Sequence, residues 1–161
     1  MPLSILKDFL DENRIRYVVI SHSLAYTANA IAALTHIPGK EIAKTVIVKI
    51  ENVLAMAVVS ASQHVDLAAL KTATGAQHVD LATEYEFQDR FPDCETGAMP
   101  PFGNLYGITV FADEGLSRDK EIAFNAGSHR ELVRLAWSDF VRLVQPKLMK
   151  LAAIKHAAEV A

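Results

Sequence analysis

Hydrophobic and polar positions follow two periods along the chain, one helical and one extended. The apolar positions in residues 3–10 recur at helical spacing and predict a first helix of about three turns that ends near Asn13. Residues 16–20 are β-branched and aromatic, which predicts a short strand. Thr27 is placed as the N-cap of a second helix, which the Pro-Gly pair in residues 37–39 ends.

Two strongly apolar runs, residues 45–50 and 53–60, are separated only by Glu51 and Asn52 and predict a β-hairpin inside a sheet. Thr83 and Glu86 have the spacing of a capping box. The remaining pattern predicts helices over residues 64–72, 83–90, 138–143 (capped by Ser138) and 148–160, and strands over residues 76–80, 108–112, 121–125 and 131–135. The segment 97–107 holds three glycines and two prolines and is too broken for regular structure.

Several predicted strands are joined by links too short for a crossover helix, which argues against a doubly wound fold. We therefore predict an α+β (mixed α/β) fold with a mostly antiparallel or mixed central sheet flanked by helices. Nothing marks a domain boundary, so the 161 residues are expected to form one domain, residues 1–161. With 51% hydrophobic and 22% charged residues, a chain of this length can build a full core without disulfides or metal.

Charge and targeting features narrow the function classes. The net charge of −3 argues against a protein that coats nucleic acid, and no basic recognition helix suggests specific DNA binding. Lys7, Asp8 and Asp11 interrupt the stretch that a secretory signal would need, and no run reaches the roughly 20 apolar residues of a membrane span. We expect a cytoplasmic protein without membrane contact. The basic residues form three groups that are expected to be solvated faces: Lys40, Lys44 and Lys49; Arg130, Arg134 and Arg142; Lys147, Lys150 and Lys155.

Lys44 stands directly before a strand that is predicted to be buried, which is an unusual place for an ammonium group. Two interpretations follow from the pattern alone. The side chain either extends outward along the surface, or it faces a cleft.

Two further segments are candidates for chemistry. In residues 97–103, glycines permit close backbone approach and two prolines stiffen the chain, so the segment is either a rigid turn or a loop that aims amides at a ligand. In residues 124–129, Ser128 and His129 are neighbours on an extended chain and point to opposite faces, so they are not expected to form a direct dyad. Ser128 is then a candidate to bind substrate or a turn, and His129 a structural histidine.

The other reactive residue types support no alternative centre. The histidines lack zinc-type spacing and cysteine companions, so neither a metal nor another cofactor is expected. Cys94 lies between Asp93 and Glu95, whose charges are expected to raise the pKa of the thiol, so it is not expected to be a nucleophile.

Five segments taken together resemble the YbaK/EbsC family, freestanding relatives of the editing domain inserted in bacterial prolyl-tRNA synthetases. The similarity runs over residues 22–145, and these segments carry it in sequence order: His22; Gly39 with Ala43-Lys44-Thr45; His64-Val65-Asp66-Leu67; Gly97-Ala98-Met99-Pro100-Pro101-Phe102-Gly103; and Ala126-Gly127-Ser128-His129.

The resemblance implies an aminoacyl-tRNA deacylase that works in trans and hydrolyses the ester of a mischarged small amino acid. It implies Lys44 as the catalytic group. The substrate-binding residues that it implies are His22, Thr45, Gly97, Ala98, Met99, Pro100, Pro101, Phe102, Gly103, Gly127, Ser128 and His129. The expected partner is the acceptor end of an aminoacyl-tRNA, with an aminoacyl-tRNA synthetase as a further candidate. Two alternatives stay open: a non-catalytic module that binds tRNA or a synthetase, and a different small-molecule hydrolase.

Overall fold

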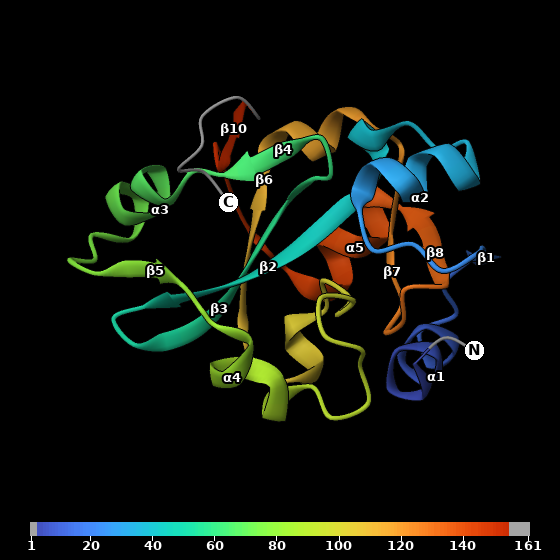
Figure 1. Cartoon of the computed structure of the whole chain (residues 1–161), viewed down its shortest axis with the longest axis horizontal. Helices are drawn as coiled ribbons and strands as arrows, with labels where there is room; N and C mark the ends of the chain where they lie inside the picture. Colours follow the sequence, from blue (N-terminus) through green and yellow to red (C-terminus); the bar gives the residue numbers. More distant parts are fainter. Residues whose placement is uncertain (1–2, 155–161) are drawn as a thin grey trace.

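The computed structural model describes residues 3–154, which fold into sheets flanked by short helices (Figure 1). The helices are α1 (Ser4–Glu12), α2 (Ala28–Thr35), α3 (Leu67–Thr74), α4 (Glu84–Phe87) and α5 (Trp137–Val144), with single 3₁₀ turns η1 (Gly39–Glu41), η2 (Gln88–Arg90), η3 (Gly103–Leu105) and η4 (Glu114–Arg118). The strands are β1 (Tyr17–Ser21), β2 (Ala43–Ile50), β3 (Val53–Ser60), β4 (Gln63–Val65), β5 (Val79–Leu81), β6 (Thr109–Asp113), β7 (Glu121–Asn125), β8 (Glu131–Ala136), β9 (Lys147–Met149) and β10 (Ala152–Ile154).

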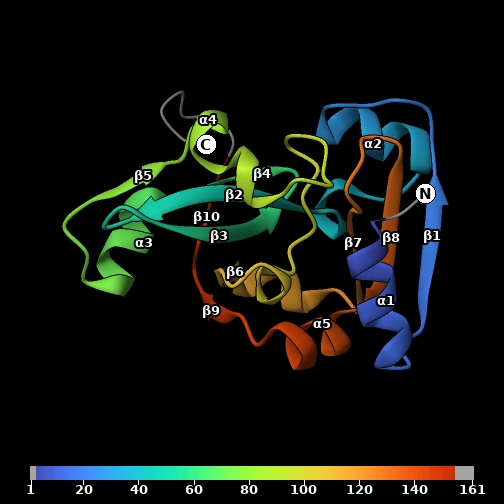
Figure 2. The ribbon, with the colours of Figure 1, turned by 90° about the horizontal axis from the view of Figure 1, so that it is seen from below.

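The largest sheet has five strands in the order β5-β2-β3-β6-β9 and is mixed. The predicted hairpin β2–β3 is antiparallel, whereas β6 runs parallel to both β3 and β9. A second, antiparallel sheet has the order β1-β8-β7, and β10 pairs with β4. Figure 2 shows the three-stranded sheet at one end of the molecule, beside α1 and α2, with the long hairpin extending toward the other end. The predicted α+β fold with a mixed central sheet is confirmed.

The continuous apolar runs of β2 and β3 are explained by burial on both faces of the sheet. Ile47, Met56 and Val58 pack into the main core with α1, α5 and the loop after α4. Val48 and the alternate β3 residues face α3 and a second core cluster. Because side chains alternate along a strand, a hairpin covered on both faces needs apolar residues at nearly every position.

Local signals placed several elements correctly. The hydroxyl of Thr27 accepts a hydrogen bond from the N–H of Ala30, and the predicted capping box of Thr83 and Glu86 is present at α4. Each such cap is worth about 1 kcal/mol of helix stability. The predicted helix over 83–90 continues beyond α4 only as the 3₁₀ turn η2.

Two predicted helix starts were wrong, and in each case a tertiary contact determines the observed start. His64 lies in β4, paired with Ala153, so the helix starts only after Asp66, which caps it. Helix α5 begins before Ser138, because the N–H of Trp137 donates to the carbonyl of Lys120.

The predicted helix over 148–160 is replaced, as far as Ile154, by strands β9 and β10. The carboxylate of Asp113 accepts hydrogen bonds from the N–H groups of Leu151 and Ala152, at 2.8 and 3.0 Å, and holds the chain extended there. Residues 155–161 of that prediction lie outside the described part of the chain.

Candidate active site

Lys44 lies at the point where the two larger sheets meet. It is the second residue of β2, half-buried, and pairs with Val59 of β3. Two residues earlier, Ile42 forms a parallel bridge to Ala123 of β7, so β2 begins between β3 on one side and β7 on the other. The predicted position of Lys44 at the mouth of a core strand is confirmed, and its catalytic role stays a prediction.

The loop from Gly97 to Gly103 is held rigidly against the core. Gly97 has a φ of +87°, which a residue with a side chain rarely adopts, and residues 98–103 are buried. The ring of Phe102 packs against the rings of Phe9, Phe124 and Phe140. The side chains of Met99 and Phe102 belong to the main core, so contact with a ligand would fall to the backbone of this loop.

The segment around Gly127 lies directly beside this loop. The N–H of Gly127 donates to the carbonyl of Ala98 at 2.9 Å, and the N–H of Glu95 donates to the carbonyl of Gly127 at 2.8 Å. Gly127 has a φ of +98° and a Cβ there would lie 3.0 Å from the Cβ of Leu3. Glycine is therefore required at the junction of the two segments for both conformational and steric reasons.

Ser128 and His129 are engaged separately. The hydroxyl of Ser128 accepts a hydrogen bond from the N–H of Arg130 at 3.2 Å, whereas Nε2 of His129 lies 2.9 Å from the carbonyl of Thr96. The N–H of His129 also donates to the Glu95 carboxylate at 2.9 Å. The geometry therefore joins His129 to the loop and not to Ser128, as the alternation of an extended chain predicts.

The segment that contains His22 completes the cluster. The backbone N–H of His22 donates to the carbonyl of Arg130 at 2.8 Å, and the N–H of Ala25 donates to the carbonyl of His129 at 3.1 Å. The exposed ring of Tyr26 lies over the ring of His129, with centroids 4.7 Å apart. Segments 22–26, 95–103 and 127–131 thus form one hydrogen-bonded unit.

Several of the buried side-chain polar atoms that lack a hydrogen-bond partner belong to these segments and to strands β2 and β7. Within residues 3–154 these atoms are Nε2 of His22, Oγ1 of Thr45, Oδ1 of Asn125 and Nδ1 of His129, and two further ones lie in β4 and β8, Nδ1 of His64 and Nε of Arg134. A buried polar atom left without a partner costs about 1–3 kcal/mol, so such atoms call for an explanation. Nδ1 of His22 and Nε2 of His129 each contact a backbone carbonyl, which can only accept, so these nitrogens carry the hydrogen of a neutral ring. The other nitrogens, Nε2 of His22 and Nδ1 of His129, are then acceptors. Asn125 was not predicted as a site residue, although it ends a strand in a segment that was.

The family model for the aminoacyl-tRNA editing domain matches residues 22–143. The chain belongs to the aminoacyl-tRNA editing domain family. It is similar to the Multifunctional Ser/Thr-tRNA deacylase ProXp-y of Escherichia coli, in strain K12 and in O157:H7, with 30% identity over 136 residues and 81% of each chain covered. The chain is therefore a hydrolase that acts on the ester bond of aminoacyl-tRNA.

Solved structures share the fold of this editing domain. A candidate trans-editing enzyme for prolyl-tRNA synthetase superposes with a TM-score of 0.81 at 20% identity, over 92% of this chain and 95% of that one. The protein APE2540 superposes with a TM-score of 0.84 at 18% identity, over 93% of this chain and all of that one. At these identities the similarity describes the fold alone.

The pKa of the Cys94 thiol is raised, as predicted, but the main cause is not the charge of its acidic neighbours. Burial is the largest cause of its raised pKa; the charge of Asp93 adds to it, while the contact with the Tyr106 hydroxyl at 3.6 Å acts in the opposite direction. The Glu95 carboxylate is bound to the N–H of His129.

Among residues 3–154, no group of three His, Cys, Asp or Glu residues lies close enough to hold a metal ion, and no helix is long and apolar enough to cross a membrane.

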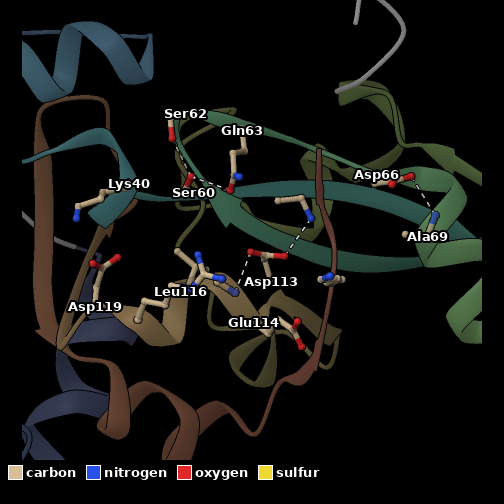
Figure 3. Close-up of a pocket in the computed structure, with 14 residues that line it drawn as sticks. Lys40, Ser60, Ser62, Gln63, Asp66, Ala69, Asp113, Glu114, Leu116 and Asp119 are labelled. Carbon is tan, nitrogen blue, oxygen red and sulfur yellow. Dashed lines mark hydrogen bonds between the residues drawn. The ribbon is translucent and has the colours of Figure 1, made fainter. Parts of the chain in front are cut away.

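A cavity of about 740 Å³ opens beside the beginning of β2, and it was not predicted from the sequence (Figure 3). It is lined by Lys40, Ser60, Ser62, Gln63, Asp66, Ala69, Asp113, Glu114, Gly115, Leu116, Arg118, Asp119, Lys150 and Ala152. Lys40 and Lys150 had been predicted to lie on separate solvated faces. They lie 110 positions apart, and only the folded chain brings them to the same cavity.

Proposed function

We propose that this editing domain removes a small amino acid from mischarged tRNA, with Lys44 as the essential charged group and the segments around Gly97 and Gly127 as the walls of the pocket. The observation that supports this assignment best is that Oγ1 of Thr45, in β2, and Oδ1 of Asn125, in the adjoining strand β7, are buried without a hydrogen-bond partner. A bound substrate would supply the hydrogen-bond partners that Oγ1 of Thr45, Oδ1 of Asn125 and Nδ1 of His129 lack.

The chemistry requires little beyond positioning and charge. An aminoacyl ester is already activated, so water or the ribose 2′-hydroxyl needs only to be oriented against the carbonyl carbon while the developing oxyanion is stabilised. In this proposal the Lys44 ammonium stabilises the negative charge. The N–H groups of Ala98, Gly127 and His129 already donate to acceptors within the protein, so we assign the oxyanion contact to the N–H groups of Gly97 and Ser128.

We further propose that serine or threonine is the amino acid removed. The hydroxyl of Ser128 accepts from the N–H of Arg130, which leaves its hydrogen available to donate to a hydroxyl of the substrate. A site built to hydrogen-bond a hydroxyl discriminates against an analogue that lacks it by about 10⁴-fold or more, whereas one methylene is worth only about 1–3 kcal/mol. The similarity to a Ser/Thr-tRNA deacylase is consistent with this assignment.

A panel of tRNAs charged with serine, threonine, alanine, valine and proline tests the proposal. We expect rapid release of serine and threonine and slower release of the other amino acids. Equal rates for serine and alanine would contradict the proposed hydroxyl contacts, and no release from any tRNA by the folded protein would contradict the proposed function. An aminoacyl-tRNA synthetase is a further candidate partner, and the cytoplasm is the compartment that the substrate implies.

A further inference from the structure

The cavity beside β2 lies where parallel strands end. Ser60 is the last residue of β3, Asp113 is the last residue of β6, and Lys150 directly follows β9. These three strands run parallel to one another, and ligands of open α/β sheets bind outside the carboxyl ends of such strands. Its volume of about 740 Å³ lies within the range of small-ligand sites, roughly 300–1,000 Å³.

The cavity adjoins Lys44 without containing it. Ser60, which lines the cavity, is the register partner of Ala43, the residue directly before Lys44. Residues paired in this way have Cα atoms about 4.5–5.5 Å apart. A chain molecule whose reacting end lies at Lys44 can therefore continue into the cavity.

Three cationic side chains line the cavity from three separate segments. Lys40 comes from η1, Arg118 from η4 and Lys150 from the chain after β9. Within residues 3–154, none of the three forms an ion pair with a carboxylate. Cations from unconnected segments that face one cavity and form no ion pair are suited to a ligand that brings several negative charges.

Four acidic side chains also line the cavity, and two of them are already engaged by backbone N–H groups of the protein. Asp113 accepts three backbone N–H groups, those of Gly115, Leu151 and Ala152, and Asp66 caps α3. Figure 3 shows the carboxylate of Glu114 directed away from Ser60 and Gln63, whereas Asp119 lies on the Lys40 side of the cavity. Ser60, Ser62 and Gln63 form a hydrogen-bonded row of hydroxyls and an amide along the upper wall.

We infer that this cavity binds the single-stranded 3′ end of the tRNA, the nucleotides that precede the terminal adenosine. Their phosphates contact Lys40, Arg118 and Lys150, and their ribose hydroxyls and base edges contact the row of Ser60, Ser62 and Gln63. A lining of both charged and neutral polar groups matches single-stranded RNA, which proteins recognise through its backbone together with its exposed base edges. The inference rests on the proposed function, because it places the ester at Lys44.

Two triple variants of equal charge test this inference. The cavity variant carries Lys40→Ala, Arg118→Ala and Lys150→Ala. The control variant carries Arg16→Ala, Lys71→Ala and Lys120→Ala, three exposed basic residues outside the cavity. Both are assayed with a seryl-tRNA and with seryl-adenosine, the same ester without the preceding nucleotides, and both are titrated with a fluorescein-labelled RNA oligonucleotide that ends in ACCA.

In the cavity variant we expect the ratio of kcat/KM for seryl-tRNA to that for seryl-adenosine to fall about tenfold or more, and affinity for the oligonucleotide to fall likewise. The salt dependence of oligonucleotide binding should become shallower by about 0.7 for each lost phosphate contact. The control variant should match the wild type. Equal ratios and equal RNA affinities in the two variants would overturn the inference. If the wild type hydrolyses neither ester, serine is not the amino acid removed, and the oligonucleotide titration alone decides the role of the cavity.

Discussion

The two ends of strand β2 each carry a lysine, and the surroundings of the two lysines differ. Lys49, near the hairpin turn, forms an ion pair with Glu86 at 2.5 Å, and Glu86 also closes the capping box of α4. Next to it, the Glu51 carboxylate accepts the N–H groups of Gln77 and His78. At the Lys44 end, by contrast, the polar atoms of Thr45 and Asn125 are buried without partners, and a large cavity opens. Polar groups that satisfy one another indicate a structural role, whereas polar groups that await a partner indicate a ligand.

The largest expected effect on stability comes from Phe102, which supports the loop at the Lys44 end from behind. Phe102→Ala removes a fully buried ring that contacts three other aromatic rings, and we expect a loss of about 3–5 kcal/mol in the free energy of unfolding. Tyr85, in α4 at the Lys49 end, is 85% exposed. Urea denaturation should therefore detect almost no change in Tyr85→Ala, and a similar loss in both variants would contradict the comparison.

The glycines of the site should be more sensitive than a glycine outside it. Gly97→Ala and Gly127→Ala each force a side chain into a positive φ, at a cost of about 1–2 kcal/mol. Gly107→Ala carries the same backbone strain, but its Cβ would meet nothing within 4 Å. We expect thermal destabilisation in all three, largest in Gly127→Ala because its Cβ would also crowd Leu3, and loss of deacylation only in the first two. Full activity of Gly127→Ala would remove this segment from the pocket.

A smaller effect, dependent on pH, belongs to the Lys49 end. The hydrogen-bonded ion pair with Lys49 and the hydrogen bonds from Thr83 lower the pKa of Glu86 to about 2 from an ordinary value of 4.5. Because the folded-state pKa is the lower one, the stabilisation is present above pH 4.5 and is lost as the pH falls toward 2. The melting temperature of Glu86→Gln should therefore fall less than that of the wild type when the pH is lowered from 5 to 2.5. An identical pH profile for the variant and the wild type would argue against the pair.

The smallest expected effect concerns the thiol and metal ions. If Lys44 and fixed dipoles carry the reaction, then Cys94→Ser and treatment with a chelator should leave the deacylation rate within about twofold of the untreated wild type. Burial keeps the pKa of the Cys94 thiol above its usual value, which disfavours a thiolate. Loss of turnover in either arm, with circular dichroism unchanged, would point to a thiol or metal mechanism.

How much of the molecule could be predicted from its sequence depended on how local the determining contacts are. The hairpin β2–β3 and the capping box at Thr83 are specified by residues within a few positions of each other, and both were predicted correctly. The strands β9 and β10 were predicted as helix, because their extended form depends on β6, on β4 and on the Asp113 carboxylate, all far away in the sequence.

The same distinction applies to the site. Lys44 stood out because an ammonium group beside a buried strand is unusual within a single short segment. The cavity could not be found in this way, because its cations lie on segments that are adjacent only after β3, β6 and β9 have paired. Asn125 was missed for a related reason. Its lack of a hydrogen-bond partner becomes visible only when the neighbouring strands are in place.

The central claim is that the Lys44 end of β2 carries out the hydrolysis and the Lys49 end does not. The most direct measurement compares the release of serine from seryl-tRNA by Lys44→Ala and by Lys49→Ala under single-turnover conditions, with folding checked by circular dichroism. We predict that Lys44→Ala folds and loses essentially all deacylation, while Lys49→Ala keeps the wild-type rate and loses only the ion pair with Glu86. Wild-type turnover in a folded Lys44→Ala variant would contradict the account.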